Sequence, residues 1–542
     1  MGRLPRRACL CVLLSATGLA YIGCTRSDPA APGPVASPPP SQSAAVGSPG
    51  SPRDDQGKSG KLLANWPTPQ AVLVISGEMD GYLEPCGCTE GQVGGLIRRF
   101  DFVEGLKARN WPLALIDLGT LVKDPTAAPG GFEQAKIKFG VALRAYSALN
   151  YSAIALSAED LKVGIGEALA QFLNNLGETT KIVVANVQPT AGFESRIQAS
   201  LIIADGPVKL GVTAVIDPAR LEKLTDPHRG EADLLPSIKK PDEVLGKVLA
   251  DLEPKSDYQV LLVQGSPELA KRLAAAYPGF DMVVSTAQSD DPLEREPALL
   301  NDGKTMLIDV GRRGKNLGVI GFFADASRRP RYQLVNLNSR DEKPGSPMKK
   351  IIQDEYRNML KGAGVVESFP RHDYTGGASG ATFVGAETCK RCHPNTYTHW
   401  VSTKHAHAFD SLEKDPRPNT MYDAECVSCH TTGFEYTSGY RSASATPHLK
   451  GTQCENCHGP ASKHVSAPDS LEFRKPMRVT AIQAEKGDMC NRCHDEDNSP
   501  KFNFATYWSQ VRHNGLDEYS NPKVHQGITP RVARKPESSA GK

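Results

Sequence analysis

The sequence predicts a multidomain protein, in which an α/β layered domain is followed by a mostly α-helical or irregular domain. Short apolar runs alternate with helical segments from about Ala71 to Asn336, which is typical of sheets covered by helices. The motif Cys-x-x-Cys-His occurs four times between Cys389 and His494. Twelve of the 13 histidines lie from His372 onward, so imidazole chemistry is confined to the C-terminal third.

Two segments precede the predicted domains. Residues 1–24 resemble an export signal, because a short apolar run follows three arginines and is too short to span a membrane. Cys24 ends a sequence that resembles a lipoprotein cleavage box, which predicts a lipid anchor at this cysteine; secretion without acylation is the alternative. Residues 25–66 are rich in Pro, Ala, Ser and Gly and predict a disordered linker. We therefore expect a periplasmic or cell-envelope lipoprotein.

The segment 67–340 is predicted to form the α/β domain. Strands are expected at 71–76, 113–118, 153–156, 182–185, 210–216, 260–263, 282–285, 306–310 and 318–323. Helices are expected at 95–109, 132–149, 161–176 and 267–277. The sequence has no glycine-rich phosphate loop of the Walker or dinucleotide-binding type.

Several short segments of this domain resemble the metallophosphoesterase domain of the periplasmic 5′-nucleotidase family. They are Ser76-Gly77-Glu78-Met79-Asp80-Gly81, Gly94-Gly95-Leu96-Ile97-Arg98-Arg99, Asp117-Leu118-Gly119-Thr120, Ala155-Leu156-Ser157-Ala158-Glu159-Asp160 and Val184-Ala185-Asn186-Val187. The resemblance covers roughly residues 70–325 and implies a metallophosphoesterase-like fold.

The residues at the family's metal-binding positions depart from its pattern. These positions hold Glu78, Asp80, Thr120, Ala158, Glu159 and Gln264, and the family's late Gly-His-x-His is Thr286-Ala287-Gln288-Ser289. A two-metal hydrolytic site needs several imidazole and carboxylate ligands, and His228 is the one histidine of this domain. We expect an inactive phosphoesterase fold. The alternative is an oxygen-ligand site for a hard cation, formed by Glu78, Asp80, Asp117 and Glu159.

Cys86 and Cys88 lie where the first strand passes into a loop. The pair either forms a small strained disulfide or stays reduced, because the other cysteines belong to the leader or to the four motifs. One hypothesis is a redox-active pair near the C-terminal motifs, and the other is a structural or incidental bridge.

Between the two domains, residues 341–381 are predicted to form an amphipathic helix and a glycine-rich hinge. The second domain is expected at 382–515. Residues 516–542 are polar and charged, and predict a flexible tail.

The four Cys-x-x-Cys-His motifs predict four covalently bound c-type haems. Two thiols at this spacing reach the vinyl groups of one porphyrin, and the adjacent imidazole becomes the proximal iron ligand. The cofactor-binding cysteines are Cys389, Cys392, Cys426, Cys429, Cys454, Cys457, Cys490 and Cys493, and the proximal ligands are His393, His430, His458 and His494. Zinc knuckles are the alternative, but they do not require a histidine after each cysteine pair. About 26 residues per haem are too few for an apolar core, so the porphyrins must form the core themselves.

Distal iron ligands are expected among the remaining histidines of this domain. We predict His405, His464 and His513 in this role, with His407 and His448 as further candidates. His372 and His525 are expected to be exposed to solvent.

The C-terminal domain resembles the cytochrome c-554 tetrahaem family over about residues 382–515. The likeness is carried by the motifs and by their intervals: Val384-Gly385 before the first motif, the segment from Trp400 to Ala406, Gly433-Phe434 after the second motif, and Gly459-Pro460 after the third. The resemblance implies that three haems have two histidine ligands and that the haem on His430 is five-coordinate. His448 does not correspond to a ligand of the family, and closure of the open iron by His448 is the alternative.

The sequence therefore predicts an extracytoplasmic multihaem cytochrome that exchanges electrons with redox partner proteins. One alternative is a haem enzyme acting on a small nitrogen compound at an open haem, and another is a phosphoesterase or nucleotidase with a cytochrome appendage. A net charge of +2 provides no basic surface for nucleic acid.

Overall fold

The structure is a computed structural model, and it describes residues 63, 65–85, 92–125, 128–188, 195–222, 238–292, 294–324, 329–487, 489–495 and 498–517. The predicted export signal, Cys24, Cys86, Cys88, His228 and His525 lie outside these residues, as do most of the predicted linker and tail. Among the described residues, no helix is both long and apolar enough to cross a membrane.

The first sheet has seven strands in the order β13-β12-β1-β2-β3-β4-β5. Their bounds are β1 (Ala71–Ser76), β2 (Leu113–Asp117), β3 (Ala153–Ala155), β4 (Lys181–Val183), β5 (Ile197–Gln198), β12 (Asn316–Phe322) and β13 (Arg331–Asn336). Strands β1 to β5 are parallel, whereas β12 is antiparallel to β1 and β13. Every residue of β1 is buried, as expected for a central strand of a sheet covered on both faces.

The second sheet has six strands in the order β10-β11-β9-β8-β7-β6. Their bounds are β6 (Ser200–Ile203), β7 (Leu210–Ile216), β8 (Tyr258–Gln264), β9 (Met282–Ser285), β10 (Ala298–Leu300) and β11 (Thr305–Ile308). The four central strands are parallel, and the edge strands β6 and β10 are antiparallel to their neighbours.

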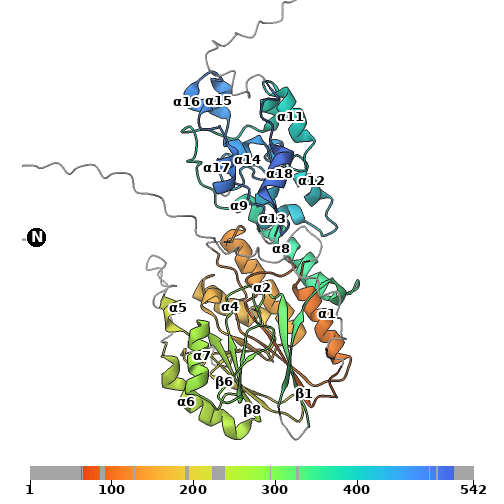
Figure 1. Ribbon diagram of the computed structural model, residues 1–542, viewed down its shortest axis with the longest axis vertical. Coiled ribbons are helices and arrows are strands. Elements are labelled where there is room, and N and C mark those ends of the chain that lie inside the picture. Colours follow the sequence, from red (N-terminus) through yellow and green to blue (C-terminus); the bar gives the residue numbers. More distant parts are fainter. Residues whose placement is uncertain are drawn as a thin grey trace, which may run out of the picture. The chain divides into compact units, whose positions relative to one another are not determined.

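Helices cover the outer faces of both sheets (Figure 1). They are α1 (Leu96–Lys107), α2 (Gly131–Leu149), α3 (Ala158–Leu161), α4 (Ile165–Asn175), α5 (Pro218–Glu222), α6 (Pro241–Leu252) and α7 (Pro267–Ala276). One apolar cluster joins α1, α2 and α4 to the first sheet, and another joins α6 and α7 to the second. A third cluster, which includes Ile75, Ile116 and Leu262, lies between the sheets. The layers are therefore helix, sheet, sheet and helix, which confirms the predicted α/β layered class.

The chain leaves this domain through a helical segment. A π-helix at Lys350–Glu355 continues directly into α8 (Tyr356–Ala363), which ends at Gly364 in the left-handed conformation. Helix α9 (Val365–Ser368) follows at once. Met348, Ile352 and Leu360 are buried in the same apolar cluster as α2, so this segment packs against the α/β domain.

The rest of the described chain consists of short helices and irregular segments, as predicted. The helices are α10 (Ala386–Lys390), α11 (Pro394–Val401), α12 (Ala408–Glu413), α13 (Ala424–His430), α14 (Cys454–His458), α15 (Ser462–Ser466), α16 (Leu471–Arg474), α17 (Ala481–Lys486) and α18 (Phe504–Val511). Helices α11, α15, α16 and α18 contain no buried residue. Protein side chains alone therefore provide little core in these helices.

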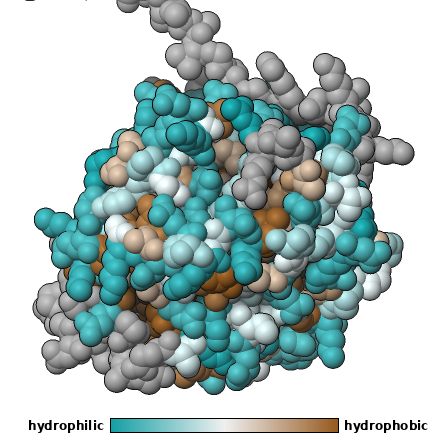
Figure 2. All heavy atoms as spheres, turned by 90° about the horizontal axis from the view of Figure 1, so that it is seen from below, coloured by the Kyte–Doolittle hydropathy of each residue, from teal (hydrophilic) through white to brown (hydrophobic). Residues whose placement is uncertain are grey.

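The face of the molecule drawn in Figure 2 is mostly hydrophilic, with apolar residues in small groups between polar ones. Large apolar side chains that are exposed in the α/β domain include Leu173 on α4 and Leu299 on β10. Isolated exposed apolar residues are ordinary on a protein surface and do not indicate a binding face.

Candidate haem-binding site

The Cys-x-x-Cys-His motifs adopt helical turns. The second motif lies at the end of α13, and the third motif spans the whole of α14. In the first motif the backbone N–H of His393 donates to the carbonyl of Cys389 at 2.9 Å, and in the fourth that of His494 donates to Cys490 at 2.8 Å. Residues three and four apart on a helical turn share one face, so each motif presents two thiols and an imidazole on the same side.

The eight motif cysteines are all free thiols. Thiols of different motifs lie against one another: Cys389 contacts Cys454, and Cys429 contacts Cys493. Cys457 also lies within electrostatic reach of Cys490. In space the first motif therefore neighbours the third, the third neighbours the fourth, and the fourth neighbours the second.

Three proximal histidines each face another histidine. The ring centres are 6.5 Å apart for His393 and His464, 6.1 Å for His494 and His405, and 5.8 Å for His458 and His513. A metal–imidazole bond is about 2.0 Å long and a ring nitrogen lies about 1 Å from the ring centre, so two imidazoles on opposite sides of one iron have centres roughly 6 Å apart. The three pairs fit two-histidine ligation of haem iron.

Zinc knuckles would require a different arrangement of the same side chains. A structural zinc ion takes about four Cys or His ligands around one point. Across the described residues, no group of three or more His, Cys, Asp or Glu side chains is arranged to hold a metal ion. The described part of the chain therefore does not bring four such ligands of the motifs together around one point.

Hydrogen bonds to backbone carbonyls orient several of the imidazoles. The Nδ1 atom of His458 donates to Met477 O at 2.6 Å, and that of His513 to Val511 O at 2.9 Å. A donor at Nδ1 leaves the lone pair at Nε2, which is the atom offered to a metal. Burial lowers the pKa of His458. The neutral ring, which can act as a ligand, is thus favoured.

The imidazole of His430 has a proximal anchor but no facing histidine among the described residues. Its Nδ1 lies 2.6 Å from the carbonyl of Ala408 and 3.2 Å from Ser411 Oγ. The described ring contacts between histidines do not include His430. Among the described residues, the second motif thus differs in this respect from the other three.

The further candidates His407 and His448 lie elsewhere. The two ring nitrogens of His407 are 3.1 Å from Asp410 and 3.0 Å from the carbonyl of Val401. His448 is exposed, and its side chain lies next to Gly385, just before the first motif. His372 is exposed, as expected from the sequence. Neither further candidate faces His430.

Acidic residues of the α/β domain meet arginines at the carboxyl ends of the strands. Asp80 pairs with Arg312 at 2.9 Å, and Glu159 pairs with Arg220 at 2.9 Å. Burial raises the pKa of Glu78 to about 8 and that of Asp80 to about 6. Guanidinium groups thus balance part of the acidic charge at this edge.

Asp117 is enclosed by side chains of the same domain. Its Oδ2 accepts hydrogen bonds from Ser76 at 2.5 Å and Tyr146 at 2.7 Å, and lies 3.9 Å from Arg99 Nη1. Arg99 and Asp117 are both almost fully buried. The Asp117 carboxylate is therefore part of the buried polar contacts within the core beside the first sheet.

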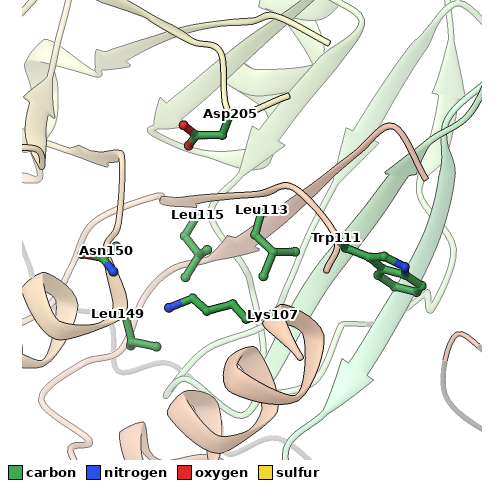
Figure 3. Close-up of a pocket in the computed structure, with 7 residues that line it drawn as sticks. All are labelled: Lys107, Trp111, Leu113, Leu115, Leu149, Asn150 and Asp205. Atoms are coloured by element: carbon green, nitrogen blue, oxygen red, sulfur yellow. The ribbon is translucent and has the colours of Figure 1, made fainter. Parts of the chain in front are cut away.

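A pocket of about 350 Å³ lies at the amino-terminal ends of β2 and β3. Figure 3 shows its lining, which is Lys107, Trp111, Leu113, Leu115, Leu149, Asn150 and Asp205. It contains no cysteine or histidine. The carboxyl ends of parallel strands, where ligands of such sheets usually bind, are at the opposite edge.

The motif turns and the facing imidazoles are typical of a c-type cytochrome. Residues 388–459 match the family model described as "Cytochrome c554 and c-prime". The curated cytochrome c-554 of Nitrosomonas europaea is 31% identical over 139 residues, which cover 22% of this chain and 59% of the relative. The chain thus spans less than two thirds of that relative. The resemblance predicted for the C-terminal region is confirmed.

Solved structures of other proteins are similar to this chain. The 5′-nucleotidase precursor from Thermus thermophilus has a TM-score of 0.45 at 17% identity, covering 56% of this chain and 62% of that one. The calcineurin-like phosphoesterase YfkN from Bacillus subtilis has a TM-score of 0.42 at 17% identity. The match covers 54% of this chain and 99% of YfkN. At such identities the likeness concerns the fold alone.

Proposed function

We propose that this chain is an extracytoplasmic multihaem cytochrome that transfers electrons through four covalently bound haems. The observation that carries the proposal is the set of three imidazole pairs, with ring centres 5.8–6.5 Å apart, each containing the histidine of one motif. When bound, haem iron supplies one-electron redox chemistry.

In this proposal each side chain has a simple task. The two thiols of a motif hold the porphyrin by thioether bonds. The paired histidines would hold the iron, and an iron with two histidine ligands would pass electrons and leave no position for a substrate. The carbonyls of Met477 and Val511 fix the His458 and His513 rings.

The haem count of the purified full-length protein tests this proposal. We expect four haems per chain by pyridine haemochrome assay and by the added mass of the polypeptide. The double variant Cys490→Ser, Cys493→Ser should hold three, whereas Ser428→Ala, which leaves every motif cysteine and histidine in place, should hold four. Fewer than four haems in the unaltered protein, or bound zinc instead, would contradict the proposal.

A second candidate function is a haem enzyme acting on a small nitrogen compound, such as nitric oxide or hydroxylamine. The observation that favours it is the single motif histidine, His430, that faces no other imidazole in the described part of the chain. Carbon monoxide added to the reduced protein should then change the spectrum of one haem in four. An unchanged spectrum would eliminate this candidate.

The proposed location is the cell envelope, with Cys24 as a lipid anchor and unidentified redox proteins as partners. Covalent haem attachment in bacteria normally takes place outside the cytoplasm, and residues 1–24 resemble an export signal. We expect the protein in the membrane fraction of cells that produce it and a Cys24→Ser variant in the soluble fraction. Equal fractionation of the two proteins would remove the anchor.

A further inference from the structure

Helix α13, which carries the second motif, is held by a buried glutamine of the α/β domain. Gln134 lies on α2 and is 0% exposed. Its Nε2 donates to Asp423 Oδ1 at 2.7 Å and to Tyr356 Oη at 2.9 Å, and its Oε1 accepts from the backbone N–H of Ala424 at 3.1 Å. The glutamine amide thus satisfies groups at the first turn of α13.

One turn further along α2, a lysine contacts the same helix. Lys138 Nζ lies 2.5 Å from Glu425 Oε2, and the two side chains are 13% and 30% exposed. Ion pairs that are shielded from water are screened less than surface pairs. Helix α2 therefore brings both a neutral amide and a cation to the start of the second motif.

A third set of contacts joins Glu84, in the segment that follows β1, to two arginines. The carboxylate of Glu84 accepts a hydrogen bond from Arg357 on α8 and lies 3.5 Å from Arg417. Gln353 donates to the other carboxylate oxygen at 2.8 Å. Arg357 is 2% exposed, and within the described residues its Nε and Nη1 atoms have no hydrogen-bond partner. Glu84 thus provides the negative charge that contacts this buried guanidinium.

Four charged groups of this region, Asp423, Glu425, Arg357 and Arg417, act on the first cysteine of the second motif. Burial raises the pKa of the Cys426 thiol, and the carboxylates of Asp423 and Glu425 raise it further, whereas Arg357 and Arg417 lower it. Charges interact strongly where water is excluded. The attachment point of this motif therefore lies in the field of buried and half-buried charges.

We define the junction network as the charged and polar side chains that meet at α13. Gln134, Lys138, Asp423 and Glu425 contact one another at the start of this helix. The network also includes Arg357 and Arg417, whose charges act on Cys426, and Glu84, which contacts both arginines.

We propose that the α/β domain, through the junction network, sets the reduction potential of the haem attached at Cys426 and Cys429. The inference rests on the proposed function, because it requires a haem on this motif. Reduction lowers the positive charge at the iron by one unit, so a nearby cation raises the potential and a nearby anion lowers it. The α/β domain is then a tuning part of the cytochrome, with no need for a hydrolytic activity of its own.

Two substitutions of opposite charge test the inference on the haem-loaded, full-length protein. Glu84→Gln leaves Arg357 and Arg417 without their shared carboxylate and should raise one of the four midpoint potentials. Arg417→Gln removes a cation and should lower the same potential. A tenfold change in the reduction equilibrium corresponds to about 59 mV for a one-electron couple, and we expect shifts of this size. The readout is a potentiometric titration followed by visible and electron paramagnetic resonance spectra.

Glu133→Gln is the matched control, because it removes a carboxylate from the same helix α2 at a side chain that is 64% exposed. It should leave all four potentials unchanged. Shifts of the same sign in the two test variants, equal shifts of all four haems, or no shift would overturn the inference. If the Glu84→Gln variant loses haem, the potential of the Arg417→Gln variant alone tests the inference. Arg417 is 35% exposed, so its replacement disturbs the packing less. A loss of haem from the unaltered protein would contradict the proposed function instead.

Discussion

Replacing His513 by alanine is expected to turn one low-spin haem into a high-spin haem that binds carbon monoxide. His513 faces His458 at 5.8 Å between ring centres, and alanine offers no ligand in its place. His458 keeps its hydrogen bond to the carbonyl of Met477, so the proximal side remains intact. The unaltered protein should bind carbon monoxide at one haem and the variant at two, as measured by titration of the reduced protein and by its high-spin resonance signal.

His407→Ala is the control for this experiment. Both ring nitrogens of His407 are used by Asp410 and by the carbonyl of Val401, and the side chain is 58% exposed. Its removal should leave the number of carbon monoxide-binding haems unchanged. An equal number in His513→Ala and in the unaltered protein would show that His513 is not an iron ligand.

The stability of the α/β domain is expected to fall as the pH rises from about 4.5 to about 8, in part because of Glu78. Burial raises the pKa of this carboxyl from 4.5 to about 8. The hydrogen bond from the backbone N–H of Ala287 lowers the pKa, but its effect is smaller. In that interval the unfolded chain has lost a proton that the folded chain keeps, so rising pH favours unfolding. A shift of this size corresponds to up to about 4 kcal/mol at pH 8.

Glu78→Gln should remove this part of the pH dependence. The glutamine keeps an oxygen for the Ala287 N–H but does not ionise, so the variant should unfold at higher urea concentration than the unaltered protein at pH 8 and at a similar one near pH 5. Glu133→Gln, which changes an exposed carboxylate, should keep the original pH dependence. Identical pH dependence of the unaltered protein and Glu78→Gln would refute the buried, protonated state of Glu78.

Much of the α/β domain is predictable because its central strands are continuous apolar runs. All nine predicted strands are present, and β1, β7 and β9 have the predicted bounds. The sequence does not reveal β13 or the separation into two sheets. Strand β13 begins Arg331-Tyr332-Gln333, of which Arg331 is exposed and the other two are half-buried, so its strand character comes from pairing with β12 and not from its own composition.

In the cytochrome region, local spacing identifies the cysteines and the proximal histidines, but the distal partners depend on the tertiary structure. Sequence reasoning names His405 as a candidate, yet its partner His494 lies in the last motif, far along the chain. The junction network is not predictable in this way. Gln134 resembles any polar residue of an amphipathic helix, and its burial becomes evident once α13 is placed against α2.

The neighbour relations among the motif thiols have a consequence for how this region matures. Cys389 touches Cys454 of the third motif, and Cys429 touches Cys493 of the fourth, so the pairings interleave along the polypeptide. With this arrangement the four motifs cannot complete their contacts one after another along the chain. The second motif can contact the fourth only after the fourth has been synthesised. Truncation before the fourth motif should therefore disturb the second motif as well, because the polypeptide that neighbours Cys429 would be missing.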